Sequence, residues 1–166
     1  MSTATQNGVE QMEINIGIDE EHRKKIADAL SKVLADSYVL YLKTHNYHWN
    51  VTGELFHSLH EQFEQQYAEL ADAIDEIAER IRALGYKAPG TFQEFQKLTS
   101  IEEDPEKPEA LEMVRRLAVG NEQVLRTARE ALKPANDAED EATVDLLTQR
   151  LHVHSKTAWM LRSHLE

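Results

Sequence analysis

The chain has 166 residues, which is enough for one domain with a sizeable core. Its 30 acidic and 18 basic residues give a net charge of −12, which argues against a surface for nucleic acid or anionic membranes and suits the attraction of cations. The absence of cysteine excludes disulfides, cysteine-based zinc sites and thiol catalysis, and without a long apolar run or a leader we expect a cytoplasmic protein with no membrane segment.

The first long helix is expected to follow a flexible N-terminal tail. Residues 1–18 include neither lysine nor arginine and are mostly small or polar, which is typical of a mobile tail. Asp19 is a good N-cap, and Glu20 and Glu21 occupy the first turn, where carboxylates interact favourably with the helix dipole. The helical pattern continues from there and is expected to end near Asn50.

The stretch from Leu55 to Leu84 is the element around which the chain is organised. Thr52 and Gly53 break the preceding helix, and Gly85 is a natural residue to follow the helix end. Apolar residues recur at spacings of three and four, as in an amphipathic helix that faces a core: Leu55, Leu59, Phe63, Tyr67, Leu70, Ile74, Ile77, Ile81 and Leu84. These first two helices should form an antiparallel hairpin.

The segment from Tyr86 to Pro108 interrupts the helical pattern. Pro89 and Gly90 break it, and Thr91 with Glu94 makes the capping box of a short helix. We expect this segment to cross from one helical hairpin to the next.

A third and a fourth long helix complete the predicted fold. Pro134 is expected to end the third, and a polar linker over residues 135–141 leads to the fourth, which runs to about Leu165. The expected inward residues are Leu111, Val114, Leu117, Val124, Leu125, Ala128 and Leu132, then Leu147, Leu151, Ala158, Leu161 and Leu165. The connection lengths predict an all-α domain over residues 19–166: a four-helix bundle with a short helix in its middle crossover, the arrangement of ferritin-like folds.

The organising helix also carries a second stripe, of residues that bind metals. His60 and Glu64 stand one turn apart, as do Asp75 and Glu79, so each pair can point at one ion. At about 1.5 Å of rise per residue, however, Glu64 and Asp75 lie roughly 16 Å apart, whereas nitrogen and oxygen ligands bind at about 2 Å. One ion could hardly span both pairs.

If all four residues serve one site, two chains must therefore meet. Two antiparallel copies about a twofold axis would set each His60/Glu64 pair against a partner's Asp75/Glu79 pair and create two equivalent sites. The alternative is an ordinary solvated acidic flank with His60 at its edge.

His48 is a further candidate ligand from the preceding helix. It lies twelve residues before His60, across the break, so closure of the hairpin could bring its imidazole to the His60/Glu64 end. A half-site with two histidines and a glutamate, facing one with Asp75 and Glu79, mixes nitrogen and oxygen ligands suited to iron or zinc. Iron would permit redox chemistry. A structural role is the alternative for a lone histidine on a helix.

The run from Lys43 to Gly85, KTHNYHWNVTGELFHSLHEQFEQQYAELADAIDEIAERIRALG, resembles the signature of the Dps proteins, the mini-ferritins. Its HWNV-x-G-x-x-F-x-x-LH core and its later D-x-x-x-ER carry the resemblance, and a terminal W-x-x-x-x-x-L pattern extends it as far as Glu166. The resemblance implies a hollow shell of twelve identical subunits that oxidises Fe(II), preferably with hydrogen peroxide, and stores ferric mineral inside.

The resemblance also implies which residues bind iron. The family's ferroxidase ligands correspond to His48, His60, Asp75 and Glu79 in this chain, shared between the two subunits of a dimer. Where an aspartate usually follows the second histidine by one turn, this chain has Glu64, whose extra methylene changes its reach toward iron.

Acidic residues near the start of the fourth helix have two interpretations. In the family such residues line threefold pores through which Fe(II) enters, and the likeness suggests Glu141 and Asp145 here. The alternative is that they only favour a helix N-terminus through its dipole. Some relatives compact DNA through lysine-rich tails, but this chain has no basic residue before Arg23, so DNA binding is not expected.

The other candidates have simpler explanations. Trp49 could intercept stray oxidising equivalents beside the site, or could simply pack in an interface. Glu54 and His57 have the Glu-x-x-His spacing of larger di-iron bundles, but no second such motif follows. The remaining histidines are expected to have surface or packing roles: His45, His57, His152, His154 and His164.

Overall fold

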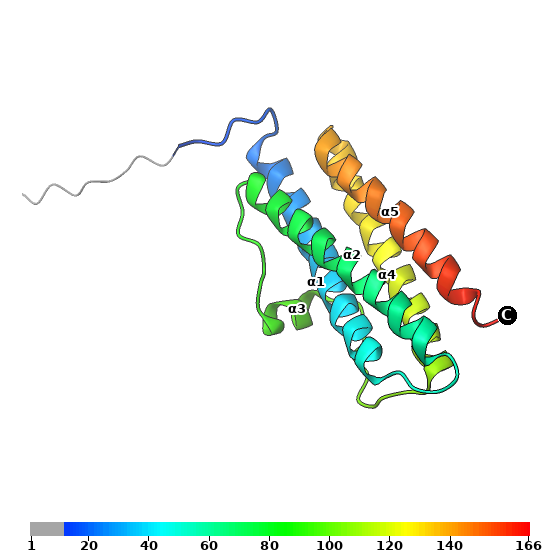
Figure 1. The fold of residues 1–166 in the computed structure, drawn as a ribbon. Helices are drawn as coiled ribbons and strands as arrows, with labels where there is room; N and C mark the ends of the chain where they lie inside the picture. Colours follow the sequence, from blue (N-terminus) through cyan, green and yellow to red (C-terminus); the bar gives the residue numbers. More distant parts are fainter. Residues whose placement is uncertain (1–11) are drawn as a thin grey trace, which may run out of the picture.

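The computed structural model describes residues 12–166, which form an all-helical fold (Figure 1). The helices are α1 (Glu20–Asn50), α2 (Phe56–Ala83), α3 (Phe92–Leu98), α4 (Ala110–Asp137) and α5 (Glu141–Arg162). None of these described helices is apolar over a long enough stretch to span a bilayer. The predicted four-helix bundle with a short helix in the crossover is confirmed.

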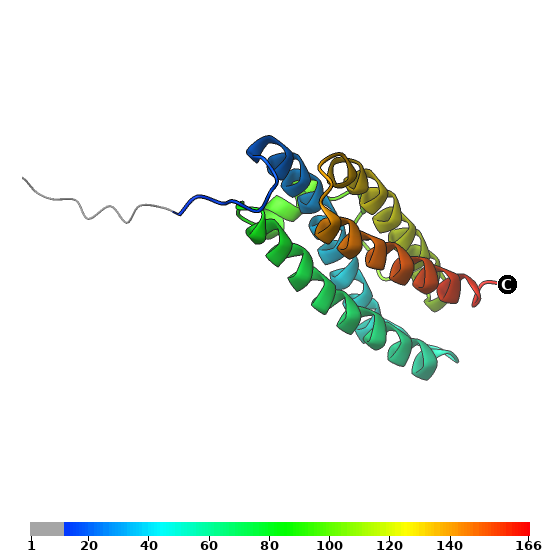
Figure 2. The same ribbon diagram turned by 90° about the horizontal axis from the view of Figure 1, so that it is seen from above.

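Two antiparallel hairpins make up the bundle (Figures 1 and 2). Helix α1 packs against α2 and α4, and α5 packs against α4, whereas the backbones of α2 and α5 come close at only a few positions. The short helix α3 lies beside α1 in the connection between the hairpins. Residues 12–18 precede α1 without helical structure, and the part of the predicted tail over residues 1–11 lies outside the described residues.

Local signals in the sequence determine where several helices begin. The Asp19 carboxylate accepts a hydrogen bond from the His22 backbone at 2.9 Å, which confirms it as the N-cap of α1 and lowers its pKa. Both hydrogen bonds of the Thr91/Glu94 capping box are present at the start of α3. These caps provide acceptors for backbone N–H groups that have no partner within the helix.

Some predicted boundaries and inward positions are wrong. Helix α4 continues through Pro134 to Asp137, because a proline so near the end removes one helical bond while its own carbonyl still accepts from the Ala138 backbone at 3.2 Å. The linker is therefore residues 138–140, and α5 ends at Arg162. Leu111, in the first turn of α4, is 46% exposed, and Leu55, just before α2, is 38% exposed, so neither lies in the core.

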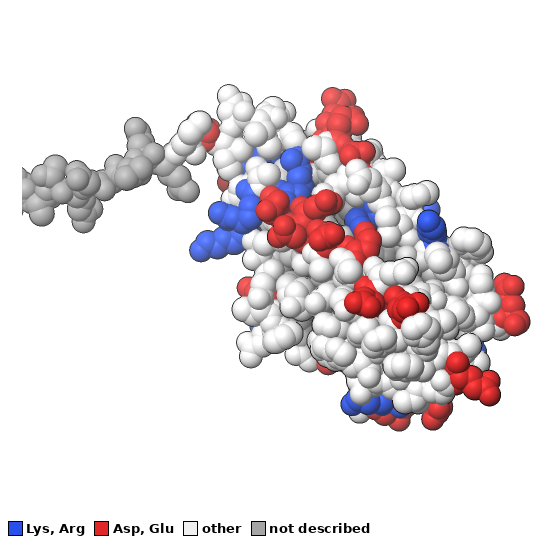
Figure 3. Space-filling model, viewed as in Figure 1, with Lys and Arg blue, Asp and Glu red and all other residues white. Residues whose placement is uncertain are grey.

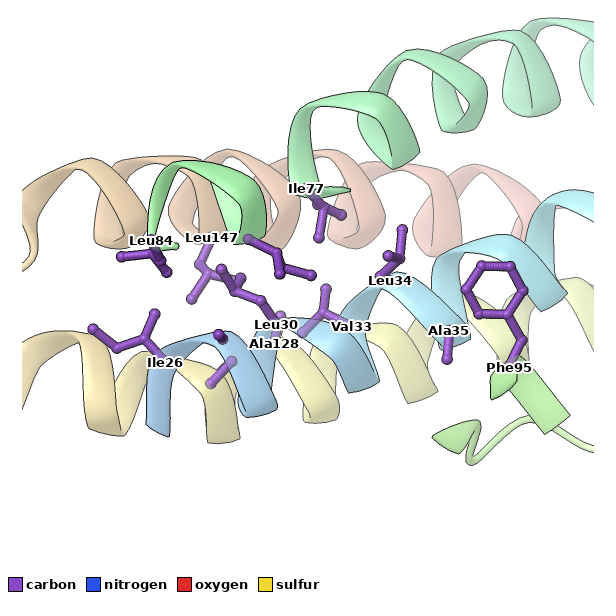
Figure 4. Packing of buried hydrophobic residues seen from close by; sticks show 13 residues of the cluster. Ile26, Leu30, Val33, Leu34, Ala35, Ile77, Leu84, Phe95, Ala128 and Leu147 are labelled. Carbon is purple, nitrogen blue, oxygen red and sulfur yellow. The ribbon is translucent and has the colours of Figure 1, made fainter. Parts of the chain in front are cut away.

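The buried apolar residues form two clusters. The first joins the N-terminal half of α1 to the C-terminal half of α2 and to α4 and α5 (Figure 4). The second lies at the other end of the bundle and includes Leu40, Leu59, Phe63, Leu117 and Leu161. Along α5, the buried polar side chains of Arg150 and His154 fall between Leu147 of the first cluster and Leu161 of the second.

The turn after α2 depends on a glycine. Gly85 has φ +98, and a Cβ at this position would collide with the side chains of Ile14 and Arg23. We expect Gly85→Ala to lower the free energy of unfolding by about 2–3 kcal/mol, measured by urea unfolding at one protein concentration. Gly53 is the matched control, because its φ is +100 but nothing lies within 4 Å of a Cβ there, so Gly53→Ala should cost only about 1 kcal/mol. Equal losses would mean that the contacts at Gly85 do not matter.

Candidate metal centre

Closure of the first hairpin brings two histidines into contact. His48 lies in the last turn of α1, and His60 lies in the second turn of α2. Their rings are stacked with centroids 3.8 Å apart and planes 16° from parallel. The Nδ1 atom of each ring is 2.8 Å from the backbone carbonyl oxygen of the other residue. The pair is therefore held by two reciprocal hydrogen bonds.

These hydrogen bonds determine which ring nitrogens can bind a metal. A carbonyl oxygen can only accept, so each Nδ1 carries the hydrogen and donates it. Each Nε2 is then left with a lone pair, and a hydrogen bond at the other ring nitrogen is the usual means of orienting a metal-binding histidine. The His60 ring also supplies a donor to the His48 carbonyl, which lies in the last turn of α1.

The carboxylates of the candidate site are divided between the two ends of α2. Glu64 follows His60 by one turn and is exposed, and Asp75 and Glu79 are exposed on the C-terminal half of the helix. Within residues 12–166, no three side chains of metal-binding type come close enough to hold one ion. A single chain thus joins His48 to His60 and leaves the Asp75/Glu79 pair on a separate part of its surface.

The surface around the second pair is strongly acidic. Acidic side chains gather over α2 and at the start of α5, on the face shown in Figure 3. The exposed acidic residues of the C-terminal half of α2 are Asp72, Asp75, Glu76 and Glu79. Such a surface raises the local concentration of cations by electrostatic attraction.

Aromatic rings that the sequence pattern does not assign to the site, among them His45 and Tyr67, lie beside the histidine pair. The His45 ring stacks on Tyr67 with centroids 4.2 Å apart and lies tilted against Trp49 at 3.8 Å, and Tyr67 meets His48 edge-on at 5.1 Å. Burial lowers the pKa of His45, and the nearby His48 lowers it further. The three-residue spacing of His45 and His48 on α1 is the signal that places both rings on one face. Trp49 is 60% exposed, so both of its interpretations stay open.

The predicted pore residues lie in the first two turns of α5. Glu141 and Asp145 are both exposed, whereas the preceding Asp140 is buried and is the N-cap of the helix. Burial raises the pKa of Asp140, but hydrogen bonds from Thr143 and Arg80 outweigh this effect and hold the pKa below its ordinary value. Asp140 is thus a structural anion, and the assignment of Glu141 and Asp145 to a pore stays a prediction.

Residues 27–166 match the family model described as "Ferritin-like domain", and this match defines the class of protein to which the chain belongs. The chain is 41% identical over 142 residues to DNA protection during starvation protein 2 of Bacillus anthracis, covering 86% of this chain and 97% of that protein. It is 35% identical over 148 residues to the DNA protection during starvation protein of Porphyromonas gingivalis, covering 89% and 93%.

Solved structures agree with these relatives. The Dps protein of Vibrio cholerae O1, described as one of the "ferritin-like diiron-carboxylate proteins", matches with a TM-score of 0.87 and 32% identity over 99% of this chain and 100% of that one. The Dps protein of Bacillus brevis matches with a TM-score of 0.85 and 35% identity over 88% and 98%. The chain belongs to the Dps family.

Proposed function

We propose that this protein oxidises Fe(II), preferably with hydrogen peroxide, and stores the ferric product inside a shell of twelve subunits in the cytoplasm, which protects against oxidative damage. The proposal rests on the stacked His48 and His60 pair, whose Nε2 atoms remain free for a metal. Membership of the Dps family and the acidic surface of α2 support it.

Each site would be shared across a twofold interface. One subunit would contribute His48, His60 and Glu64, and its partner would contribute carboxylates equivalent to Asp75 and Glu79. This sharing follows from the helix, because Glu64 and Asp75 are separated by roughly 16 Å along α2. Imidazole and carboxylate ligands suit iron and also zinc, so zinc is expected to compete at the same site.

The reaction would consume two Fe(II) for each peroxide. Each Fe(II) gives up one electron, the O–O bond of the peroxide breaks, and two protons complete two water molecules. Because both electrons are delivered together, no hydroxyl radical is released. The protein's part is to hold the substrate ions on the imidazoles and carboxylates, and Glu141 and Asp145 would guide Fe(II) through the pores.

The test combines oxidation, storage and assembly. Purified protein is loaded anaerobically with Fe(II), given limiting peroxide, and separated by size exclusion with light scattering and an iron assay. We expect ferric iron in a peak of about twelve subunits, as the family resemblance implies. Asp75→Asn should oxidise Fe(II) at least tenfold more slowly than the original protein. Glu64→Asp, which keeps a carboxylate, should stay close to the original rate. Iron in the small-molecule fraction, or full activity in Asp75→Asn, would refute the proposal.

DNA binding is the other activity that the relatives' names suggest, and no feature of this chain favours it. The net charge is −12, and the first lysine or arginine is Arg23. Binding to DNA draws its free energy largely from cations that contact phosphates, and in this chain 30 acidic residues outnumber 18 lysines and arginines.

A further inference from the structure

Helix α2 is attached to its two neighbours in different ways. It packs against α1 along its length, with apolar residues such as Phe63 and Ile77 buried between them. Its backbone comes close to that of α5 at only a few positions, and a groove of about 350 Å³, lined by residues including Gln62, Glu69 and Lys156, opens between the two helices. Both hydrophobic clusters include residues of α2 and α5, so polar contacts between these two helices act in addition to apolar packing.

Polar links cross this α2/α5 boundary at three places. One joins Gln62 to His164 at 2.7 Å, near the start of α2. Another joins Arg80 to Asp140 at 2.7 Å, near its end. The central link is an ion pair in which both terminal nitrogens of Arg150 donate to the Glu69 carboxylate, Nη2 to Oε2 at 2.9 Å. It is the one link with a bidentate, charge-assisted geometry, which restricts rotation as well as distance.

Hydrogen bonds from α4 and within α5 hold the Arg150 side chain of the central link in place. Asn121 of α4 donates its Nδ2 to the Leu117 carbonyl at 2.8 Å, so its Oδ1 faces His154 and accepts from Nδ1 at 2.8 Å. The Nε2 atom of His154 then accepts from Nη2 of Arg150 at 3.1 Å. Arg150 and His154 are both buried. A continuous chain of hydrogen bonds thus runs from α4 through α5 to α2 and fixes the direction in which Arg150 points.

The position of Glu69 on α2 gives this link its importance. Glu69 lies five residues after Glu64 and six before Asp75, which places it about 8–9 Å along the helix from each. A rotation or slide of α2 at Glu69 would move both carboxylate-bearing ends of the helix. In a twofold dimer each metal site would take one half of its ligands from each copy of α2. A displacement of α2 would therefore move both halves of every site.

We propose that Glu69 and Arg150 are positioning residues, which act through α2 to hold the two halves of the shared metal site in register. The inference rests on the proposed function and deepens it. Neither residue touches the metal. Together with the packing of α2 on α1, the ion pair fixes the rotation and axial position of α2, and the stacked histidines and the Asp75/Glu79 pair then meet the partner's ligands at bonding distance.

The test is steady-state oxidation of Fe(II) by peroxide in the assembled protein. Glu69→Gln keeps the size of the side chain and removes its charge, and should raise the Fe(II) concentration at half-maximal rate by about 2- to 30-fold while changing the maximal rate less. Arg150→Lys, which keeps the charge and loses the bidentate geometry, should show the same shift. Anaerobic Co(II) titration should show affinity loss of similar size.

Glu122→Gln is the matched control. It breaks an ion pair between Glu122 and Arg162, which joins α4 to α5 and does not touch α2, so the half-maximal Fe(II) concentration should not change. If Glu69→Gln and Arg150→Lys lower the melting temperature but leave that concentration unchanged, the residues are only structural and the positioning proposal is wrong. Asp75→Asn separates the two hypotheses: if it oxidises iron at the full rate, the shared site fails and the positioning role fails with it.

Discussion

Two variants that are each inactive in iron oxidation are expected to regain activity when they are assembled together. His60→Ala removes a ligand from one half of the proposed site, and Asp75→Ala removes one from the other half. In a mixed dimer one site receives both damaged halves and the second receives both intact halves. Random pairing makes half of the dimers mixed, so co-expressed, differently tagged chains should recover about a quarter of the original peroxide-driven rate.

A matched mixture distinguishes this complementation from a general effect of co-expression. Asp75→Ala and Glu79→Ala damage the same half, so no pairing of these two chains produces an intact site and the mixture should stay inactive. Both residues are exposed, so neither variant should disturb the core. If the His60→Ala and Asp75→Ala mixture also stays inactive while its shells assemble normally, the site is not shared between chains.

Local signals explain why so much of the fold is predictable from the sequence. The Asp19 cap and the Thr91/Glu94 capping box depend only on their own neighbours along the chain, and both have their predicted roles in the structure, as does Gly85, which follows the end of α2 with a positive φ. The amphipathic pattern of α2 is similarly local. The effect of Pro134 is harder to predict, because whether a proline ends a helix depends on how many helical hydrogen bonds remain after it.

Contacts between helices explain what the sequence could not predict. The short connection between α1 and α2 lets the sequence predict that His48 lies close to His60. It does not show that each imidazole donates a hydrogen bond to the backbone carbonyl of the other residue. Arg150 and His154 occupy inward positions of α5, where a binary pattern expects apolar residues, and only their partners Glu69 and Asn121 make that burial tolerable. The assembled metal site needs a second chain.

The buried His154 is expected to make the protein lose stability in mild acid. Burial and the neighbouring Arg150 lower its pKa to about 3, from 6.5 for an exposed histidine. Between these values the unfolded chain binds a proton that the folded chain does not. The free energy of unfolding therefore keeps the full contribution of His154 above pH 6.5 and loses it as the pH falls toward 3. The loss is about 5 kcal/mol in total and about 3 kcal/mol by pH 4.5.

The comparison that isolates this effect uses His154→Gln, whose amide can donate to Asn121 and accept from Arg150 without titrating. Urea unfolding at one protein concentration should show a smaller loss of stability between pH 7 and 4.5 in this variant than in the original protein. His152→Gln changes an exposed histidine two residues away on the same helix and should retain the full loss. Equal acid sensitivity in all three proteins would mean that other groups govern the response. His154 is expected to dominate because its Nδ1 already donates to Asn121 and its Nε2 accepts from Arg150, which leaves no place for a second proton.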